Sequence, residues 1–343
     1  MGFIDFVYGR ERENLSPHAF LTENTKGRDV LIPGGPDSVR TEFQRDRDRI
    51  IHSKSFRRLM NKTQVFLAPE GDHYRTRLTH TLEVTQIGRA MARALRLNED
   101  LTEAACLGHD LGHTPFGHAG EKVLDRLYRK GFKHNEQSLR TVEKLERNLE
   151  GLNLTYEVRD AILCHTGDKL SDTLEGRLVK FADRIAYINH DIDDAIRAKI
   201  LKAEDLPEDL IQILGKTNSI RINAMVNAVI SETSELIFRG EKTPDIAMRG
   251  DILEAMEKMR GFLFLNVYGN NIAKTEEKKA EYMLEQLYYY FVKNPGLLPA
   301  EYKRIIEDEG VERAVCDYIA GMTDRYAISV YRGIFVPKTW KSE

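Results

Sequence analysis

Apolar residues at helical spacing dominate the chain. Between residues 77 and 97, Ile87, Met91 and Leu95 recur at steps of four, which places them on one face of an α-helix. A similar mixture of apolar and charged positions predicts helices over 41–60, 100–113, 136–150, 156–165, 175–200 and most of 205–330. Alternation of β-branched residues is rare. The sequence therefore predicts an all-α fold.

The pattern changes little along the chain, so domain limits are set mainly by where the polar chemistry lies. Residues 1–39 end in a stretch rich in glycine and proline and predict an irregular N-terminal segment. Residues 40–200 hold nearly all of the chemically interesting polar residues and predict a catalytic core. Residues 201–343 predict a helical extension packed on that core. Two short pieces, Thr63–Leu67 and Ile328–Val336, are candidate strands.

Composition excludes several classes of protein. A chain of 343 residues with 41% hydrophobic content can bury one large core. The net charge of −3 argues against a strongly basic nucleic-acid binder. Three widely separated cysteines argue for a reducing compartment rather than a disulfide scaffold. With no basic leader and no apolar run of about 20 residues, we expect a cytoplasmic protein without a membrane partner.

Histidines gather in one part of the sequence. Five of the ten lie within 55 residues: His80, His109, His113, His118 and His134. His109 and Asp110 follow the apolar run AACLG, and burying such a pair is costly unless each group is paired or bound to a cation.

A metal site can be assembled around this pair. With His80 upstream and Asp183 after the apolar run LVKFA, the set offers nitrogen and oxygen ligands suited to a divalent Mg, Mn, Fe, Ni or Zn ion. Taken singly, such a histidine is more often a satisfied surface or core group, and such an aspartate is more often an ion-pairing residue on a helix face.

Two further patterns favour chemistry. Residues Asp183, Tyr187, His190, Asp191 and Asp194 recur at steps of three or four, so they share a helix face, which is either a ligand-binding face or a solvated one. His118 and Glu121 lie one helical turn apart after a glycine-rich loop, as a general acid and its orienting carboxylate would. The alternative for this second pair is a helix N-terminus with an early glutamate.

Longer motifs resemble a known family. His80, His109-Asp110 and Asp183 fit the H…HD…D pattern of HD phosphohydrolases. The stretches that resemble the bacterial deoxyguanosine triphosphate triphosphohydrolase-like family are RTEFQRDRDRIIHSKSFRRLMNKTQVF (40–66), RTRLTHTLEVTQIGRAMA (75–92), HDLGHTPFGHAGE (109–121), HNEQSLR (134–140) and DYIAGMTDRYA (317–327). The resemblance implies an all-α HD-domain fold and hydrolysis of a dNTP to a deoxynucleoside and inorganic triphosphate.

The resemblance also implies a role for each matching position. The metal ligands would be His80, His109, Asp110 and Asp183. The substrate-binding residues would be Gln64, Arg77, Arg184, Tyr187 and Asp191. The catalytic residues would be His118 with its partner Glu121, together with His113 and His134.

Partners follow from the same resemblance. Relatives form homo-oligomers, which implies a tetramer or hexamer here, and carry sites for activating nucleotides at subunit interfaces. The basic stretch Arg40, Arg45, Arg47 and Arg49 would serve as such a site or would form a solvated helix face paired with Asp46 and Asp48.

Nothing in the sequence specifies the base, and two other functions stay open. One is a different HD phosphohydrolase, such as a nucleoside 5′-monophosphatase or an alarmone hydrolase. The other is a catalytically idle oligomer that senses dNTPs or binds single-stranded DNA, against which the intact pair of His118 and Glu121 argues.

Overall fold

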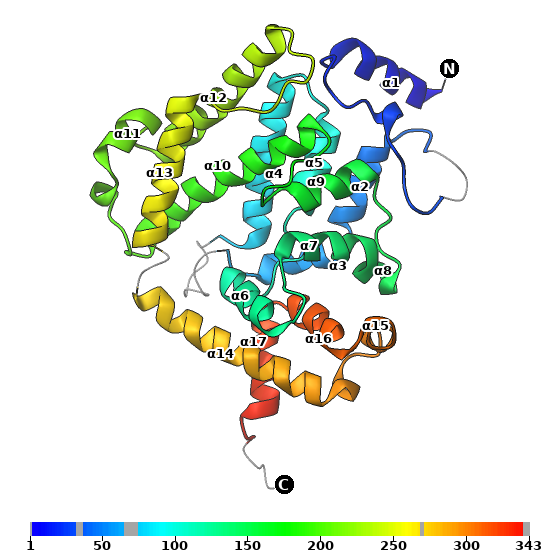
Figure 1. Ribbon diagram of the computed structural model, residues 1–343, viewed down its shortest axis with the longest axis vertical. Helices are drawn as coiled ribbons and strands as arrows, with labels where there is room; N and C mark the ends of the chain where they lie inside the picture. The colour runs from blue at the N-terminus through cyan, green and yellow to red at the C-terminus, as the bar shows by residue number, and fades with distance from the viewer. Residues whose placement is uncertain (1, 32–36, 65–74, 268–270, 339–343) are drawn as a thin grey trace.

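The computed structural model describes residues 2–31, 37–64, 75–267 and 271–338, and most of these residues are helical (Figure 1). Within these ranges there is no β-strand beyond one isolated bridge between Thr63 and Thr76, so the prediction of an all-α fold is confirmed. The α-helices are α1 (Phe3–Asn14), α2 (Glu42–Ile51), α3 (Lys54–Arg58), α4 (Arg77–Ala94), α5 (Glu99–Gly108), α6 (Gly117–Leu127), α7 (His134–Arg140), α8 (Glu146–Leu149), α9 (Tyr156–Cys164), α10 (Leu174–Arg197), α11 (Glu208–Leu214), α12 (Asn218–Phe238), α13 (Gly250–Asn266), α14 (Asn271–Lys293), α15 (Tyr302–Glu309), α16 (Val311–Ala320) and α17 (Asp324–Phe335).

Helices α4, α5 and α10 form the centre of the molecule (Figure 1). Each begins after a residue whose side chain accepts a hydrogen bond from the backbone N–H three residues on, namely Thr76, Asn98 and Thr173. Gly88 allows α4 to approach α5 closely, because a Cβ at this position would lie 2.8 Å from the Cys106 sulfur. The centre therefore depends on capped helices and on one small residue at their contact.

Three hydrophobic clusters surround this centre. The largest joins α4 and α10 to α11, α12 and α13. A second joins α6 to α14, α15, α16 and α17, and a third joins α2, α5 and α9. The first two clusters include residues on both sides of residue 200, so the C-terminal helices share their cores with the earlier ones.

Two local predictions are wrong. The candidate strand Ile328–Val336 falls almost wholly in α17, because Ile328, Tyr331 and Ile334 pack on the second cluster at helical spacing, and this packing overrides β-propensity. The segment predicted to be irregular contains α1, a helix without a fully buried side chain and therefore without a clear apolar stripe in the sequence.

Two other expectations meet the limits of the description. The candidate strand Thr63–Leu67 lies mostly outside the described residues, since the structure describes only its first two. Among the described residues, no helix combines the length and apolar character that crossing a bilayer requires.

Candidate functional site

Three helices bring the predicted metal ligands together. His80 lies in the first turn of α4, His109 and Asp110 directly follow α5, and Asp183 lies in the middle of α10. The Nε2 atom of His80 is 3.1 Å from an Asp183 oxygen, and the Nε2 atom of His109 is 3.6 Å from an Asp110 oxygen and 3.8 Å from the same Asp183 oxygen. Two ligands about 2.1 Å from one ion lie at most about 4.2 Å apart, so each of these three pairs is close enough to share a cation.

The orientation of His109 also fits a metal ligand. Its Nδ1 donates to the Cys106 carbonyl at 2.6 Å, which leaves the lone pair on Nε2 facing the other ligands. This Nε2 atom is buried and has no hydrogen-bond partner in the described part of the chain. A buried imidazole nitrogen without a partner is costly, and a cation would satisfy it.

The surroundings of Asp183 and Asp110 keep both carboxyl groups ionised. Burial opposes ionisation of Asp183, but the hydrogen bond from His80 and the charges of His109 and His80 together outweigh it and lower the pKa of Asp183 to about 2. Burial likewise opposes the charge on Asp110, but His109 and Arg77 hold its pKa well below the usual range. Arg77 donates to Asp110 at 2.6 Å, so this arginine lies beside the predicted ligands. Both carboxylates are therefore anionic and ready to bind a cation.

The predicted acid–base residues form a second group next to the first. Glu121 accepts from Nδ1 of His118 at 3.3 Å with one oxygen and from Nδ1 of His134 at 2.9 Å with the other. These hydrogen bonds overcome the effect of burial and strongly lower the pKa of Glu121. His113 stacks on His134 with ring centroids 4.6 Å apart, and burial keeps the pKa of His113 well below its usual value. The His118 side chain is 82% exposed, so it can meet a ligand directly.

A strained turn presents His118. Phe116, immediately before α6, has φ +61°, and Gly117, the first residue of α6, has φ +56°, both in the left-handed region. For Phe116 this conformation costs about 1 kcal/mol or more. The Phe116 N–H is held by an Asp324 oxygen at 3.0 Å. The C-terminal part of the chain thus fixes the turn that carries the predicted acid.

Both groups open into one cleft of about 490 Å³. The predicted residues that line it are Gln64, Arg77, His80, Asp110, His113, His118, His134, Asp183, Arg184, Tyr187 and Asp191. The remaining two, His109 and Glu121, lie behind the lining and contact it through Asp110 and His118. The structure therefore brings all thirteen predicted residues to one place.

Sequence reasoning missed several residues of the cleft. Lys180 lies one helical turn before Asp183 on α10, and Lys122 lies one helical turn after His118 on α6, so helical spacing was a usable signal for both. Arg260 reaches the cleft from α13, and His165 reaches it from the end of α9. Only tertiary structure brings these last two residues in, because neither belongs to a local motif.

The basic stretch after residue 39 lies elsewhere and is largely paired. Arg40 binds Asp37 and Asp48, and Arg45 binds Glu42. Arg47 binds Asp48 and Glu103, while Arg49 donates to the carbonyls of residues 152 and 153. The buried Asp46 pairs instead with Arg28. These contacts fit the paired helix face, while Arg40, Arg45 and Arg49 also line a separate pocket of about 280 Å³, so both alternatives stay predictions.

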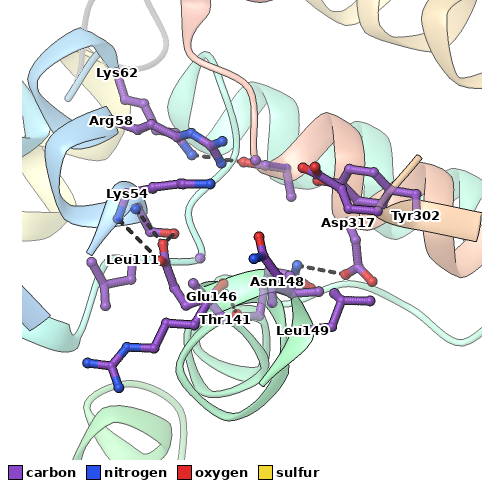
Figure 2. A pocket seen from close by; sticks show the side chains of 18 residues that line it. Lys54, Arg58, Lys62, Leu111, Thr141, Glu146, Asn148, Leu149, Tyr302 and Asp317 are labelled. Atoms are coloured by element: carbon purple, nitrogen blue, oxygen red, sulfur yellow. Dashed lines mark hydrogen bonds between the residues drawn. The ribbon is translucent and has the colours of Figure 1, made fainter. Parts of the chain in front are cut away.

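A second cavity lies behind the loop that carries the histidines (Figure 2). Leu111 and Gly112 line it, whereas their neighbours Asp110 and His113 line the cleft. In Figure 2, Lys54, Arg58 and Lys62 face Tyr302 and Asp317 across it. Its volume of about 60 Å³ is far below that of the cleft, so of these two cavities only the cleft has room for a nucleotide.

Comparison with known proteins decides the family. Residues 77–188 match the HD domain, and residues 246–333 match the phosphohydrolase-associated domain. The deoxyguanosinetriphosphate triphosphohydrolase-like protein of Caldanaerobacter subterraneus subsp. tengcongensis is 56% identical over 96% of this chain and 95% of its own length. This chain belongs to the deoxyguanosinetriphosphate triphosphohydrolase-like family. The resemblance inferred from the motifs is thereby confirmed.

Other members of the deoxyguanosinetriphosphate triphosphohydrolase-like family match over the same extent. Those of Clostridium perfringens (strain SM101 / Type A) and Desulfatibacillum aliphaticivorans are 51% and 46% identical, each over 96% of both chains. In this member, the HD match contains the four predicted ligands and the acid–base group, whereas Gln64 and Asp191 lie outside it. The associated domain contributes Arg260 to the cleft.

Proposed function

We propose that this protein is a metal-dependent triphosphohydrolase that converts a dNTP to a deoxynucleoside and inorganic triphosphate. The names of its relatives support the substrate class. One structural observation carries the proposal: four ligand-type side chains converge beside a nucleotide-sized cleft whose walls carry several lysine and arginine side chains.

We assign the metal to His80, His109, Asp110 and Asp183. A divalent cation bound there would polarise a phosphate oxygen and lower the pKa of a bound water. The residues contribute buried imidazole nitrogens and anionic carboxylate oxygens, the ligand types that bind a divalent cation.

We assign the triphosphate to the basic wall of the cleft. Arg77, Lys122, Lys180, Arg184 and Arg260 come from α4, α6, α10 and α13 and all line it. Five cationic side chains suit a triphosphate, which carries more negative charge than a single phosphate. They also stabilise the transition state as negative charge develops. Gln64, Tyr187 and Asp191 line the same cleft and are assigned to the deoxyribose.

We assign proton transfer to His118. It faces the cleft, and Glu121 orients its ring through Nδ1, which leaves Nε2 to protonate the departing 5′ oxygen. Glu121 is itself held by His134, and the stacked, neutral His113 completes the wall.

Product analysis tests this function. We expect each accepted dNTP, supplied singly and in pairs with Mg²⁺ or Mn²⁺, to yield nucleoside and inorganic triphosphate in equal amounts. Release of phosphate or pyrophosphate instead would indicate a different HD phosphohydrolase. His118→Ala should slow turnover by about 10²- to 10⁴-fold while dNTP binding persists. The exposed His52→Ala is the matched control, and wild-type protein that binds dNTP without turnover would point to a sensor.

A further inference from the structure

The second cavity, behind the loop that carries the histidines, is lined by cationic side chains without counter-ions. Lys54 and Arg58 of α3 line it, and both side chains point into it in Figure 2. Within the described ranges, neither side chain takes part in an ion pair or a hydrogen bond. Lys62 lines the cavity too, but its Nζ already donates to the carbonyls of His113 and Ala320. Two positive charges of the described lining therefore have no protein counter-ion.

The carboxylates of the same lining are engaged elsewhere or exposed. Asp317 is bound by two arginines from outside the cavity, at 2.7 Å and 2.5 Å. Glu146 accepts from the backbone N–H and from the hydroxyl of Ser55, both at 2.6 Å. Glu301 is exposed and forms no ion pair with any described residue. These acids therefore do not neutralise the two cations of α3.

Another wall of the cavity has an unusual backbone. Helix α7 continues into a π-helical turn over Thr141–Leu145, and the residues Arg147, Asn148 and Leu149 then have φ of +52°, +57° and +71°. Non-glycine residues in this left-handed region cost about 1–2 kcal/mol each, and strained residues and π-turns are frequent at functional sites. In Figure 2 this turn brings the Asn148 side chain to the cavity. The strained wall therefore supplies an amide that can donate hydrogen bonds.

The size of the cavity selects a small ligand. Its volume of about 60 Å³ is room for about four to six waters, which matches the four oxygens of a tetrahedral oxyanion and excludes a nucleotide or an inorganic triphosphate. Lys54 and Asn148 are exposed, so an ion can enter from solvent. A guanidinium and an ammonium are the side-chain groups that bind phosphate oxygens most strongly.

We propose that the second cavity binds one free tetrahedral oxyanion of the phosphate type. Arg58 and Lys54 would hold it by charge-assisted hydrogen bonds, and the Asn148 amide would donate a further one. The site lies apart from the cleft, so the inference does not rest on the proposed reaction.

An anion at this position would support the loop that carries the histidines. Leu111 and Gly112 of that loop line the cavity, whereas their neighbours Asp110 and His113 line the cleft. The bound ion would connect α3 to the turn after α7, directly behind these residues. The alternative is a cavity filled with water, in which the exposed Glu301 offsets part of the positive charge. The two alternatives differ in whether phosphate binding depends on the cations of α3.

The test is isothermal titration calorimetry of the full chain with sodium phosphate. A chelator keeps metal-bound phosphate out of the cleft, and sodium chloride holds the ionic strength constant. We expect saturable binding to wild type and a loss of about tenfold to a hundredfold in affinity for Arg58→Gln, which removes hydrogen bonds to a charged group. Lys54→Gln, at an exposed position, is a second variant in case the first fails to fold. Arg57→Gln removes the same charge from an exposed position of α3 outside the lining and should bind as wild type does.

A variant in the cleft separates the two places where phosphate can bind. Arg184→Gln weakens the basic wall of the cleft and should leave the binding that depends on Arg58 unchanged. The inference is overturned if wild type shows no saturable binding, or if folded Arg58→Gln and Lys54→Gln both bind phosphate as wild type does. Loss of all phosphate binding in Arg184→Gln alone would also overturn it, because the cleft would then be the only site.

Discussion

Lys62 is a buried amine that connects the histidine loop to the C-terminal helices. Its Nζ donates to the carbonyls of His113 and Ala320. Burial lowers the pKa of Lys62 to about 7. A neutral amine has two N–H groups, and these two carbonyls accept from both, whereas the third N–H of an ammonium would have no partner among the described residues. The contacts and the pKa therefore agree on a lysine that is easily neutralised in the folded state.

The lowered pKa of Lys62 predicts an unusual dependence of stability on pH. In the unfolded chain a lysine keeps its proton to about pH 10, whereas folded Lys62 releases it near pH 7. The unfolded state then binds more protons between these values, so the free energy of unfolding should rise with pH there, by up to about 1.4 kcal/mol per pH unit. Urea denaturation of wild type between pH 7 and pH 9.5 measures this slope.

The matched variants isolate the contribution of Lys62. Lys62→Met removes the titrating group and should flatten the rise, whatever its effect on stability at a single pH. The exposed Lys54→Met should keep the wild-type slope. Equal slopes in wild type and Lys62→Met would mean that Lys62 stays charged when folded.

At the level of elements, the loop between α5 and α6 depends on close packing against α7. A Cβ on Gly112 would lie 2.1 Å from the Ser138 backbone nitrogen and 2.2 Å from the Gln137 carbonyl carbon. The Gly112 N–H also donates to the Ser138 hydroxyl at 2.9 Å. Backbone atoms cannot give way as side chains do, so only glycine allows the loop to place Asp110 and His113 on the cleft.

Gly112→Ala should therefore destabilise the protein. We expect the free energy of unfolding to fall by about 1–3 kcal/mol because the loop must move away from α7. Gly261→Ala in α13 is the control, since nothing lies within 4 Å of the added Cβ there. In that exposed helix interior alanine should be neutral or stabilising by up to about 1 kcal/mol. Similar denaturation midpoints for Gly112→Ala and wild type would contradict the packing argument.

Helical spacing predicted which side chains of α10 share a face, but not where that face meets the cleft. Asp183, Tyr187 and Asp191 line the cleft, as the steps of three and four suggested. Asp194 lies on the same face but binds Arg75 instead. It is about 16 Å along the helix axis from Asp183, beyond the cleft. Periodicity gives the direction of a side chain, and only the packed structure gives the extent of the site.

The sequence could not predict the cleft residues that lie outside local motifs, for a related reason. The motif residues lie in continuous stretches, so their grouping could be read from one segment at a time. His165 and Arg260 enter the cleft because α9 and α13 pack near α10, and no spacing in the sequence encodes that contact. The strand expected at Ile328–Val336 failed for the same reason, because its environment is set by distant helices.

At the scale of the whole molecule, the C-terminal helices hold the loops on both sides of the cleft. Asp324, at the start of α17, accepts from the Thr63 N–H at 2.9 Å with one oxygen and from the Phe116 N–H at 3.0 Å with the other. Thr63 precedes Gln64, and Phe116 forms the strained turn before His118. One buried carboxylate in the associated domain therefore fixes two walls of the candidate active site.

This connection predicts a loss of activity from a change outside the cleft lining. Asp324→Ala frees the N–H groups of Thr63 and Phe116, so Gln64 and His118 should lose their fixed positions. Because a displacement of about 1 Å can cost about a hundredfold in rate, we expect kcat/KM for the accepted dNTP to fall by about tenfold to a hundredfold. Asp308→Ala, an exposed helix position in the same domain, should leave it unchanged. Circular dichroism would establish that the variant is folded, and full kcat/KM in folded Asp324→Ala would show that the loops hold their places without the Asp324 carboxylate.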